Sequence, residues 1–417
     1  MSPYRFPGDF LWGSATSAFQ VEGDCMNHDF YDWAVKGRIK DGTNPNDAVL
    51  HYRKYVEDID LYKAMNHNAA RIGLEWARIE PDQGSFDEEV LEHYRDELTR
   101  MKAIGLSTMV TIHHFTNPLW LVRQGGWKNP RNIECYLKFV ETAVSRLGDL
   151  VDYWLTINEP NVVALMGYLM GEHPPGEKSM LACLKVGKNM GVAHCRAYRL
   201  IHRIYLESHW GEPKVGWSMA WPNFEAVPGA FNWIARALVD RVFLTRFMDR
   251  VKGSLDFVGL QYYYSNLVWF PAKNGPHPGV PQSKLGWSIM PDRFYKVLKQ
   301  CWDRYRIPII VTENGVCDDH DELRPGYLVS HLYHLWRAIQ DGVDVRGYFV
   351  WSTMDNFEVV DGVCSPFGLV HVDHTSPEKT RTIKPSGHLY AEIIREGGLT
   401  DAMLEQYGTQ FLTGKKG

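Results

Sequence analysis

The chain has 417 residues, of which 45% are hydrophobic, and its formal net charge is −5. Acidic and basic residues are mixed along it, which excludes the basic footprint of a nucleic-acid-binding protein and a polybasic membrane patch. A chain of this length usually divides into domains unless its fold is a barrel or a large sandwich.

Eight short apolar runs are predicted to be strands, and each is too apolar for a strand with one wet face. Continuous apolar runs of this kind are typical of parallel strands that are covered on both faces. In chain order they occupy residues 11–16, 69–75, 107–113, 153–158, 214–220, 257–263, 307–312 and 346–353.

Helical patterns fill the intervals between these runs. Residues 87–104 show this best, because Val90, Leu91, Tyr94, Leu98, Met101 and Ile104 recur at helical spacing before Gly105. The other predicted helices are residues 47–65, 131–147, 180–207, 229–251, 293–305, 325–341 and 386–396. Eight alternating pairs predict an α/β protein, a (β/α)8 TIM barrel with residues 1–417 in a single domain.

A doubly wound sheet is the alternative fold. It usually has a glycine-rich phosphate loop after its first strand. The corresponding stretch here is "GSATSAFQVEG", which fits neither a dinucleotide-binding loop nor a P-loop. The barrel is therefore the preferred prediction.

The cysteines and the N-terminal stretch bear on the cellular location. Seven cysteines are scattered without a Cys-X-X-Cys pair, so neither a disulfide framework nor a zinc ribbon is expected. The opening "MSPYRFPGDFLWG" lacks the apolar segment of a signal peptide. Residues 103–122 are uncharged, but two histidines and a proline among them argue against a membrane span. A cytoplasmic location is predicted.

Polar residues gather where the predicted strands end, which is where barrel enzymes place their active sites. They are Gln20, Arg71, Glu75, His113, His114, Asn158, Glu159, Tyr263, Glu313, Trp351 and Glu358. "LTINEP" ends the fourth strand with Glu159, and "VTENG" ends the seventh with Glu313. Paired carboxylates are the apparatus for cleaving a glycosidic bond. The alternative for each is a helix cap or an ion pair with a barrel arginine.

Ten motifs in one order resemble glycoside hydrolase family one, the retaining β-glycosidases. They are "FPGDFLWGSATSAFQVEG", "YVEDIDLYKAMNHNAARIGLEWARIEP", "TIHHFTNPLWL", "GGW", "LTINEP", "GYLMGEHPPG", "DFVGLQYYYS", "VTENG", "WSTMDNFE" and "FGLVHVD". The resemblance covers nearly the whole chain. It implies a β-glycosidase that hydrolyses β-D-glucosides, and also β-galactosides and β-fucosides, without a metal or organic cofactor.

The resemblance also implies roles for individual residues. Glu159 is expected to be the general acid/base, Glu313 the nucleophile, and Arg71 a support for the nucleophile. The expected substrate-binding residues are Gln20, His114, Phe115, Asn158, Tyr263, Trp351, Glu358 and Phe367. Asn158 would bind the sugar 2-hydroxyl, Trp351 would lie under the ring, and Glu358 would accept from the 4- and 6-hydroxyls.

The chemistry of a retaining enzyme sets two further expectations. Arg71 should lower the pKa of Glu313, and the charge of Glu313 should raise the pKa of Glu159. Double displacement through a covalent glycosyl-enzyme also requires the two carboxyl groups to lie roughly 5–5.5 Å apart.

Three departures from the family pattern leave the sugar undecided. Val359 stands where a tryptophan usually donates an indole N–H, a loss of about 1–3 kcal/mol if a buried sugar hydroxyl is left unpaired. Gln261 replaces the usual asparagine, and Val363 and Pro366 replace aromatic and basic residues. Phospho-sugars and thioglucosides are disfavoured, because Glu358 and Glu159 are both present.

The predicted partners are small-molecule β-glycosides or short oligosaccharides, with no nucleic acid, no membrane and homo-oligomerisation left open. A transglycosylating β-glycosidase and a non-catalytic sugar-binding protein are the alternative functions.

Of the adjacent His113 and His114, one is expected to face the site and the other to pack outside. His371 and His374 form an HxxH pair that is expected to be structural, since no third ligand is apparent.

Overall fold

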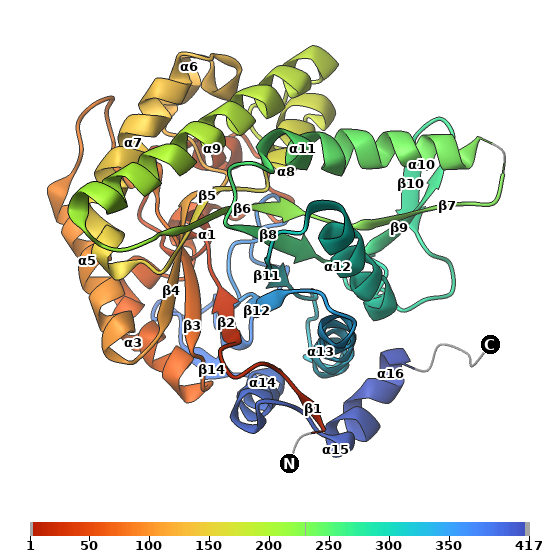
Figure 1. Ribbon diagram of the computed structural model, residues 1–417. Helices are drawn as coiled ribbons and strands as arrows, with labels where there is room; N and C mark the ends of the chain where they lie inside the picture. The colour runs from red at the N-terminus through yellow and green to blue at the C-terminus, as the bar shows by residue number, and fades with distance from the viewer. Residues whose placement is uncertain (1–2, 230, 413–417) are drawn as a thin grey trace.

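A computed structural model describes residues 3–229 and 231–412 (Figure 1). Eight parallel strands close into a barrel, and they follow one another around it in chain order. The strands are β2 (Leu11–Ala15), β3 (Ala69–Gly73), β4 (Ser107–His113), β5 (Tyr153–Asn158), β6 (Lys214–Ala220), β8 (Phe257–Tyr262), β11 (Ile309–Asn314) and β12 (Val345–Trp351). The predicted (β/α)8 barrel is confirmed. Five of the eight strands differ from the predicted bounds by one or two residues at an end, and β11 begins later than predicted and includes Glu313.

The principal helices surround this barrel. They are α3 (His51–Ala64), α5 (Glu88–Ala103), α7 (Asn132–Leu147), α9 (Met180–Ser208), α11 (Arg246–Val251), α12 (Pro291–Tyr305), α13 (Arg324–Gln340) and α14 (Pro385–Glu396). In α5, the Asp87 side chain caps the first turn by accepting from Glu89 N and Val90 N at 2.9 and 3.2 Å. The helix ends at Gly105, whose φ of 86° is the left-handed conformation that glycine adopts readily.

The helix predicted at residues 229–251 begins three residues later and is not a regular α-helix throughout. It consists of α10 (Asn232–Asp240), a π-helical turn η5 (Arg241–Thr245) and then α11, which follow one another without a break. Whereas α9 packs on α11, α10 packs on a small sheet outside the barrel. That sheet has the order β10-β9-β7, from β7 (Asn223–Ala226), β9 (Ser265–Trp269) and β10 (Lys273–Pro276). Together these elements project from one side of the molecule (Figure 1).

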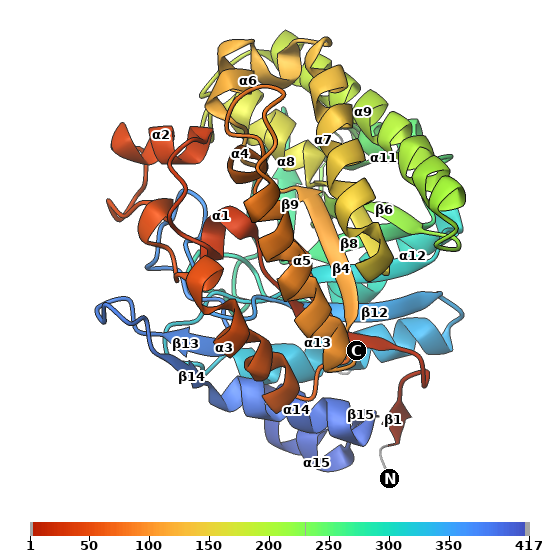
Figure 2. The ribbon, with the colours of Figure 1, turned by 90° about the vertical axis from the view of Figure 1, so that its left-hand side faces the viewer.

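The remaining elements are short. Two further two-stranded sheets pair β1 (Tyr4–Arg5) with β15 (Gly398–Leu399) and β13 (Val370–Val372) with β14 (Arg381–Ile383) (Figure 2). The short α-helices are α1 (Ala18–Val21), α2 (Asp29–Val35), α4 (Trp76–Ile79), α6 (Leu119–Arg123), α8 (Pro160–Leu165), α15 (Asp401–Met403) and α16 (Thr409–Leu412). The 3₁₀ and π turns are η1 (Pro45–Asp47), η2 (Gly126–Lys128), η3 (Gly148–Leu150), η4 (Met166–Met170) and η6 (Leu404–Gly408).

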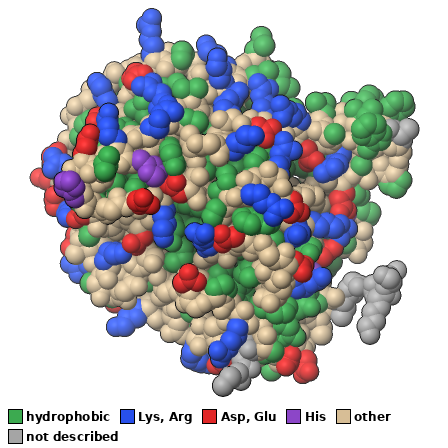
Figure 3. Space-filling model, viewed as in Figure 1, with side chains coloured by type: hydrophobic (Ala, Val, Ile, Leu, Met, Phe, Trp, Pro, Cys, Tyr) green, Lys and Arg blue, Asp and Glu red, His purple; other side chains and the backbone are tan. Residues whose placement is uncertain are grey.

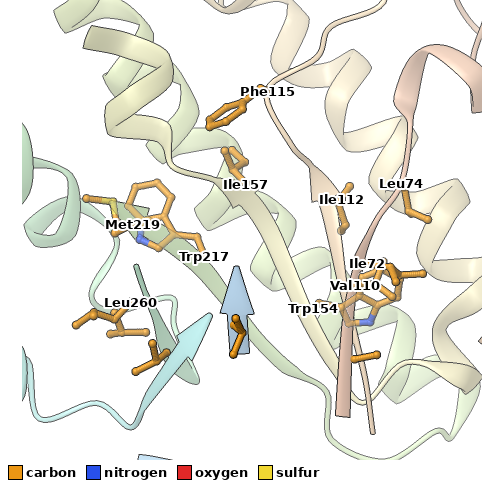
Figure 4. Close-up of a cluster of buried hydrophobic side chains, with 14 of the residues drawn as sticks. Ile72, Leu74, Val110, Ile112, Phe115, Trp154, Ile157, Trp217, Met219 and Leu260 are labelled. Atoms are coloured by element: carbon orange, nitrogen blue, oxygen red, sulfur yellow. The ribbon is translucent and has the colours of Figure 1, made fainter. Parts of the chain in front are cut away.

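Alternation along the strands divides the buried residues into two layers. Ile72, Val110, Ile112, Trp217 and Leu260 belong to the large cluster that the strands share with the helices (Figure 4). A separate, smaller cluster contains the strand residues Leu11, Ala15, Ala69, Met109, Leu155, Phe257, Ile310, Phe349 and Trp351. Neighbouring strand residues point to opposite faces, so the second set fills the barrel interior. The interior is therefore a packed core, above which the strand ends can hold polar groups.

Across residues 3–229 and 231–412, the structure has no helix long and apolar enough to cross a membrane.

Candidate functional site

A cavity of about 350 Å³ lies at the carboxyl ends of the barrel strands. Ten of the eleven site residues predicted from the sequence line it: Gln20, His114, Phe115, Asn158, Glu159, Tyr263, Glu313, Trp351, Glu358 and Phe367. The eleventh, Arg71, is fully buried and is bonded to Glu313. Strand ends thus bring together residues that are up to 347 positions apart, the separation of Gln20 and Phe367.

Glu313 is held by three donors. Arg71 Nη1 and Gln261 Nε2 donate to its Oε1, each at 2.5 Å, and the Tyr263 hydroxyl donates to its Oε2 at 2.5 Å. Arg71 is on β3, and β8 supplies Gln261 and leads into Tyr263. Both oxygen atoms of the Glu313 carboxyl are therefore fixed from two sides of the barrel.

Glu159 is in a different environment. It follows β5 with a φ of 43°, and Pro160 begins α8 directly after it. Proline disfavours the right-handed helical conformation in the residue before it and suits the first position of a helix. The Glu159 N–H donates to Ser218 O at 2.9 Å. Among the described residues, no group donates a hydrogen bond to its carboxyl, which faces the cavity.

These environments separate the two carboxyl groups electrostatically. Burial and the neighbouring charge of Glu313 raise the pKa of Glu159 well above its usual value. Burial also raises the pKa of Glu313, while the Arg71 guanidinium and the Tyr263 hydroxyl oppose that rise. Arg71 acts in the expected direction and lowers the pKa of Glu313, but the effect of burial is larger, so the net shift is upward. When one of the two carboxyl groups carries a proton, that proton belongs on Glu159, because Arg71, Gln261 and Tyr263 stabilise the ionised form of Glu313 and no such donor from the described part of the chain reaches the Glu159 carboxyl.

Asn158 is the centre of a hydrogen-bond network beside the carboxyl groups, and it bonds to Arg71, Gln261 and His114. Asn158 Oδ1 accepts from Arg71 Nη2 and from Gln261 Nε2, both at 2.8 Å. The Asn158 amide Nδ2 lies 3.0 Å from His114 Nε2, and burial lowers the pKa of His114 well below its usual value. A neutral His114 therefore accepts from Asn158 and keeps a proton on Nδ1, which has no partner within the described part of the chain.

The other histidine of the pair packs outside the barrel, as expected. His113 contacts Trp127 with ring centroids 5.2 Å apart, and its Nε2 lies 3.2 Å from Asn117 Oδ1. In the HxxH pair, His371 Nδ1 lies 3.2 Å from Asp355 Oδ2. No group of three or more His, Cys, Asp or Glu side chains in residues 3–229 and 231–412 has metal-binding geometry.

The eighth strand ends with an aromatic ring in the cavity, and the loop after it contributes a carboxyl group. The Trp351 indole Nε1 donates to Glu358 Oε2 at 3.1 Å, and its ring stacks on His114 with centroids 5.9 Å apart. Burial raises the pKa of Glu358 to about 8, although the Trp351 hydrogen bond opposes the shift. Gln20 Oε1 is buried beside them without a partner among the described residues. These groups can bind a ligand that both donates and accepts hydrogen bonds.

Val359 follows Glu358 and lines the cavity. Its φ of 48° is strained for a β-branched residue, because such side chains clash with the backbone in the left-handed region. The cavity wall is therefore apolar at the position where the resemblance leads one to expect an indole donor.

The sequence prediction missed the outer wall of the cavity. This wall is mostly apolar and comes from loops and helices beyond the strand ends: Val162, Met166, Trp221, Pro222, Phe243, Leu285 and Trp287. Lys40 and Asp361 also line the cavity and are paired at 2.6 Å. The sequence singles out Gln261 only because it replaces the family's usual asparagine. Its position near the end of the predicted strand 257–263 is the signal that could have identified it as a site residue. The loop residues have no comparable sequence signal.

A comparison with family models matches this chain to glycosyl hydrolase family 1 over residues 2–232 and 228–399. Beta-glucosidase A of Thermotoga maritima is 31% identical to it, with 96% of this chain and 100% of that protein covered. The beta-galactosidase of Saccharolobus solfataricus is 32% identical, with 95% and 96% covered. A solved structure, the beta-glycosidase from Pyrococcus horikoshii, superposes with a TM-score of 0.90 at 32% identity and covers 97% of this chain and 98% of its own.

Proposed function

Because the chain belongs to glycosyl hydrolase family 1 and is a glycoside hydrolase, we propose that it is a retaining exo-β-glycosidase of β-D-glucosides. β-Galactosides and β-fucosides are the further substrates. The relatives named beta-glucosidase and beta-galactosidase support the glucosides and the galactosides in this range. The seven unpaired cysteines support a reducing, cytoplasmic location.

The observation that carries the proposal is the contrast between two carboxyl groups in one cavity. Glu313 is pinned by Arg71, Tyr263 and Gln261, which suits a nucleophile that must stay ionised and aimed. Glu159 has a raised pKa and faces the cavity, which suits a general acid that protonates the leaving oxygen. Once Glu313 is esterified, its charge is gone, so Glu159 loses its proton more easily and serves as the base for water.

The remaining residues are proposed to bind the sugar. Asn158 Nδ2 and the His114 Nδ1 proton would meet the ring hydroxyls, and Gln20 Oε1 would accept from another. The Trp351 ring would lie under the sugar, and Glu358 would bind the 4- and 6-hydroxyls. The apolar wall at Val359 gives no hydrogen bond to a hydroxyl there, which lowers discrimination between glucose, galactose and fucose.

Labelling with a 2-deoxy-2-fluoro-β-D-glucoside tests the mechanism. The fluorine slows both steps, so the glycosyl-enzyme accumulates and can be digested and mapped by mass spectrometry. We expect one label, on Glu313, and release of β-configured sugar from an unmodified substrate by proton NMR. A label on another residue, or an α-configured first product, contradicts the mechanism. Sugar-induced thermal stabilisation without turnover of any aryl β-glycoside would instead indicate a sugar-binding protein.

Gln261 is proposed to position the nucleophile, and Gln261→Asn tests this. Asparagine is one methylene shorter and cannot keep both hydrogen bonds, to Glu313 Oε1 and to Asn158 Oδ1. A lost hydrogen bond to a charged group costs about 1.5–3 kcal/mol, so we expect kcat/KM to fall roughly 10–100-fold. The acidic limb of the pH profile should move to higher pH, because Glu313 loses a donor that stabilises its ionised form.

The matched control is Gln406→Asn, which shortens an exposed glutamine far from the cavity. It should leave both kcat/KM and the acidic limb unchanged. A Gln261→Asn enzyme with an unmoved acidic limb would show that Gln261 only fills space.

A further inference from the structure

An apolar arm projects from the barrel beside the cavity. We define the apolar arm as residues 227–239 and 265–276, of which residue 230 is outside the described range. Its large apolar side chains are exposed: Phe231 by 64%, Trp233 by 64%, Ile234 by 45%, Leu238 by 52%, Trp269 by 36% and Phe270 by 60%. Figure 3 shows hydrophobic side chains gathered on the projection at the upper right of the molecule. Concentrations of exposed apolar surface mark interaction sites.

The arm is an ordered structure, and its exposed apolar side chains are held by hydrogen bonds and packing within it. Phe270 N donates to Asn232 Oδ1 at 2.9 Å, and the Phe231 and Phe270 rings lie 6.0 Å apart. Beneath them, Phe224, Ala235 and Val268 form a small buried cluster. Trp233, Ile234 and Leu238 lie at helical spacing on the outer face of α10, where a surface helix normally has polar residues.

The chemistry of the arm fits a lipid surface. Residues 227–239 and 265–276 contain Arg236 and Lys273 but no Asp or Glu. Arg236 is paired with Asp240, just beyond the arm, and Lys273 is exposed without an ion pair among the described residues. Trp and Phe beside cations are the composition of segments that lie in the interface of a bilayer. A narrow projection offers little self-complementary surface, whereas a stable dimer buries about 800 Å² per partner.

The base of the arm is also a wall of the cavity. Trp221 and Pro222 line the cavity and directly precede β7. Phe243 lines it too, and its ring packs edge-on against Phe224 of the arm's buried cluster at 5.7 Å. An arm seated on a membrane would hold this apolar side of the cavity close to the lipid.

We propose that the apolar arm docks on the surface of a lipid bilayer, where the enzyme meets β-glycosides whose apolar aglycones are anchored in that surface. The docking rests on the arm alone, and the choice of substrate rests on the proposed β-glycosidase function. Crossing the membrane is not required, since an aromatic tip of this kind enters only the headgroup region.

Flotation with phosphatidylcholine vesicles tests the docking. The full-length wild type is compared with Trp233→Ser/Phe270→Ser, and with a control, Leu181→Ser/Leu206→Ser, that changes two apolar residues exposed by 80% and 74% on α9. We expect the wild type and the control to float with the vesicles, and the arm variant to float at least tenfold less. Adding the anionic lipid phosphatidylglycerol to the vesicles should strengthen binding through Lys273. Salt should reverse this gain in binding.

Two further measurements separate the possible outcomes. All three proteins should hydrolyse a soluble nitrophenyl β-glucoside equally, because neither Trp233 nor Phe270 lines the cavity. The activity of the arm variant on an alkyl β-glucoside embedded in vesicles should be at least tenfold lower than that of the wild type.

Equal flotation of the arm and control variants overturns the proposal, as does no flotation of the wild type. A dimer in light scattering that depends on Trp233 and Phe270, without vesicle binding, would assign the arm to a second copy. Flotation without turnover of any glycoside would contradict the proposed function alone.

Discussion

Replacing Glu313 with glutamine is expected to lower kcat by about 10⁴-fold or more, because an amide cannot form the glycosyl ester. The fold should survive. The amide oxygen can still accept from Arg71 and Gln261, and the amide nitrogen can donate to the Tyr263 hydroxyl, which rotates to accept. Turnover of a nitrophenyl β-glucoside and the circular-dichroism melting curve measure the two effects.

The same variant tests the electrostatic coupling in the cavity. The charge of Glu313 raises the pKa of Glu159, so its removal should lower that pKa, as ¹³C NMR of labelled carboxyl groups can measure. Glu392→Gln, on the exposed face of α14, is the control and should change neither turnover nor the Glu159 titration. Wild-type turnover by Glu313→Gln would remove Glu313 from the role of nucleophile.

The barrel could be predicted from the sequence because its signal is local. The strands β4, β5 and β6 have the predicted bounds, since every residue after the first of each strand is buried, on both faces. The arm has no such signal. Its strands have four or five residues each, and the first part of the helix predicted at residues 229–251, α10, packs on these strands and not on the barrel. Nothing in the periodicity of residues 229–251 shows that the first half turns its apolar face to solvent.

The candidate site, like the fold, could be predicted from the sequence only in part. Motifs at strand ends led to Glu159, Glu313 and their polar neighbours, and the cavity brings those residues together. Two features depended on distances that the sequence does not contain. Gln261 reaches both Glu313 and Asn158 only because β8 lies next to β11 in the closed barrel. The net pKa shift of Glu313 depends on how deeply the carboxyl is buried, which the nearby Arg71 alone does not reveal.

Replacing Glu159 with glutamine is expected to cost about 10²–10⁴-fold in kcat/KM for alkyl glucosides, whose leaving oxygen needs a proton. A dinitrophenyl glucoside should lose little in the first step, because its leaving group departs as a stable anion. The glycosyl-enzyme should then accumulate as a burst, since no base activates water. Azide needs no base, so it should restore turnover and give a β-glycosyl azide.

The dependence of the rate on pH reports the protonation of Glu159 and Glu313 separately. Glu159 must be protonated to act as an acid, so activity of the wild type should fall as the pH rises through its raised pKa. Activity should also fall as the pH drops through the pKa of Glu313. In Glu159→Gln the alkaline limb should vanish and the acidic limb should remain, whereas Glu207→Gln, exposed on α9, should keep both limbs. An alkaline limb that persists in Glu159→Gln would assign it to another group. Glu358 is the group that the structure offers, because burial raises its pKa to about 8.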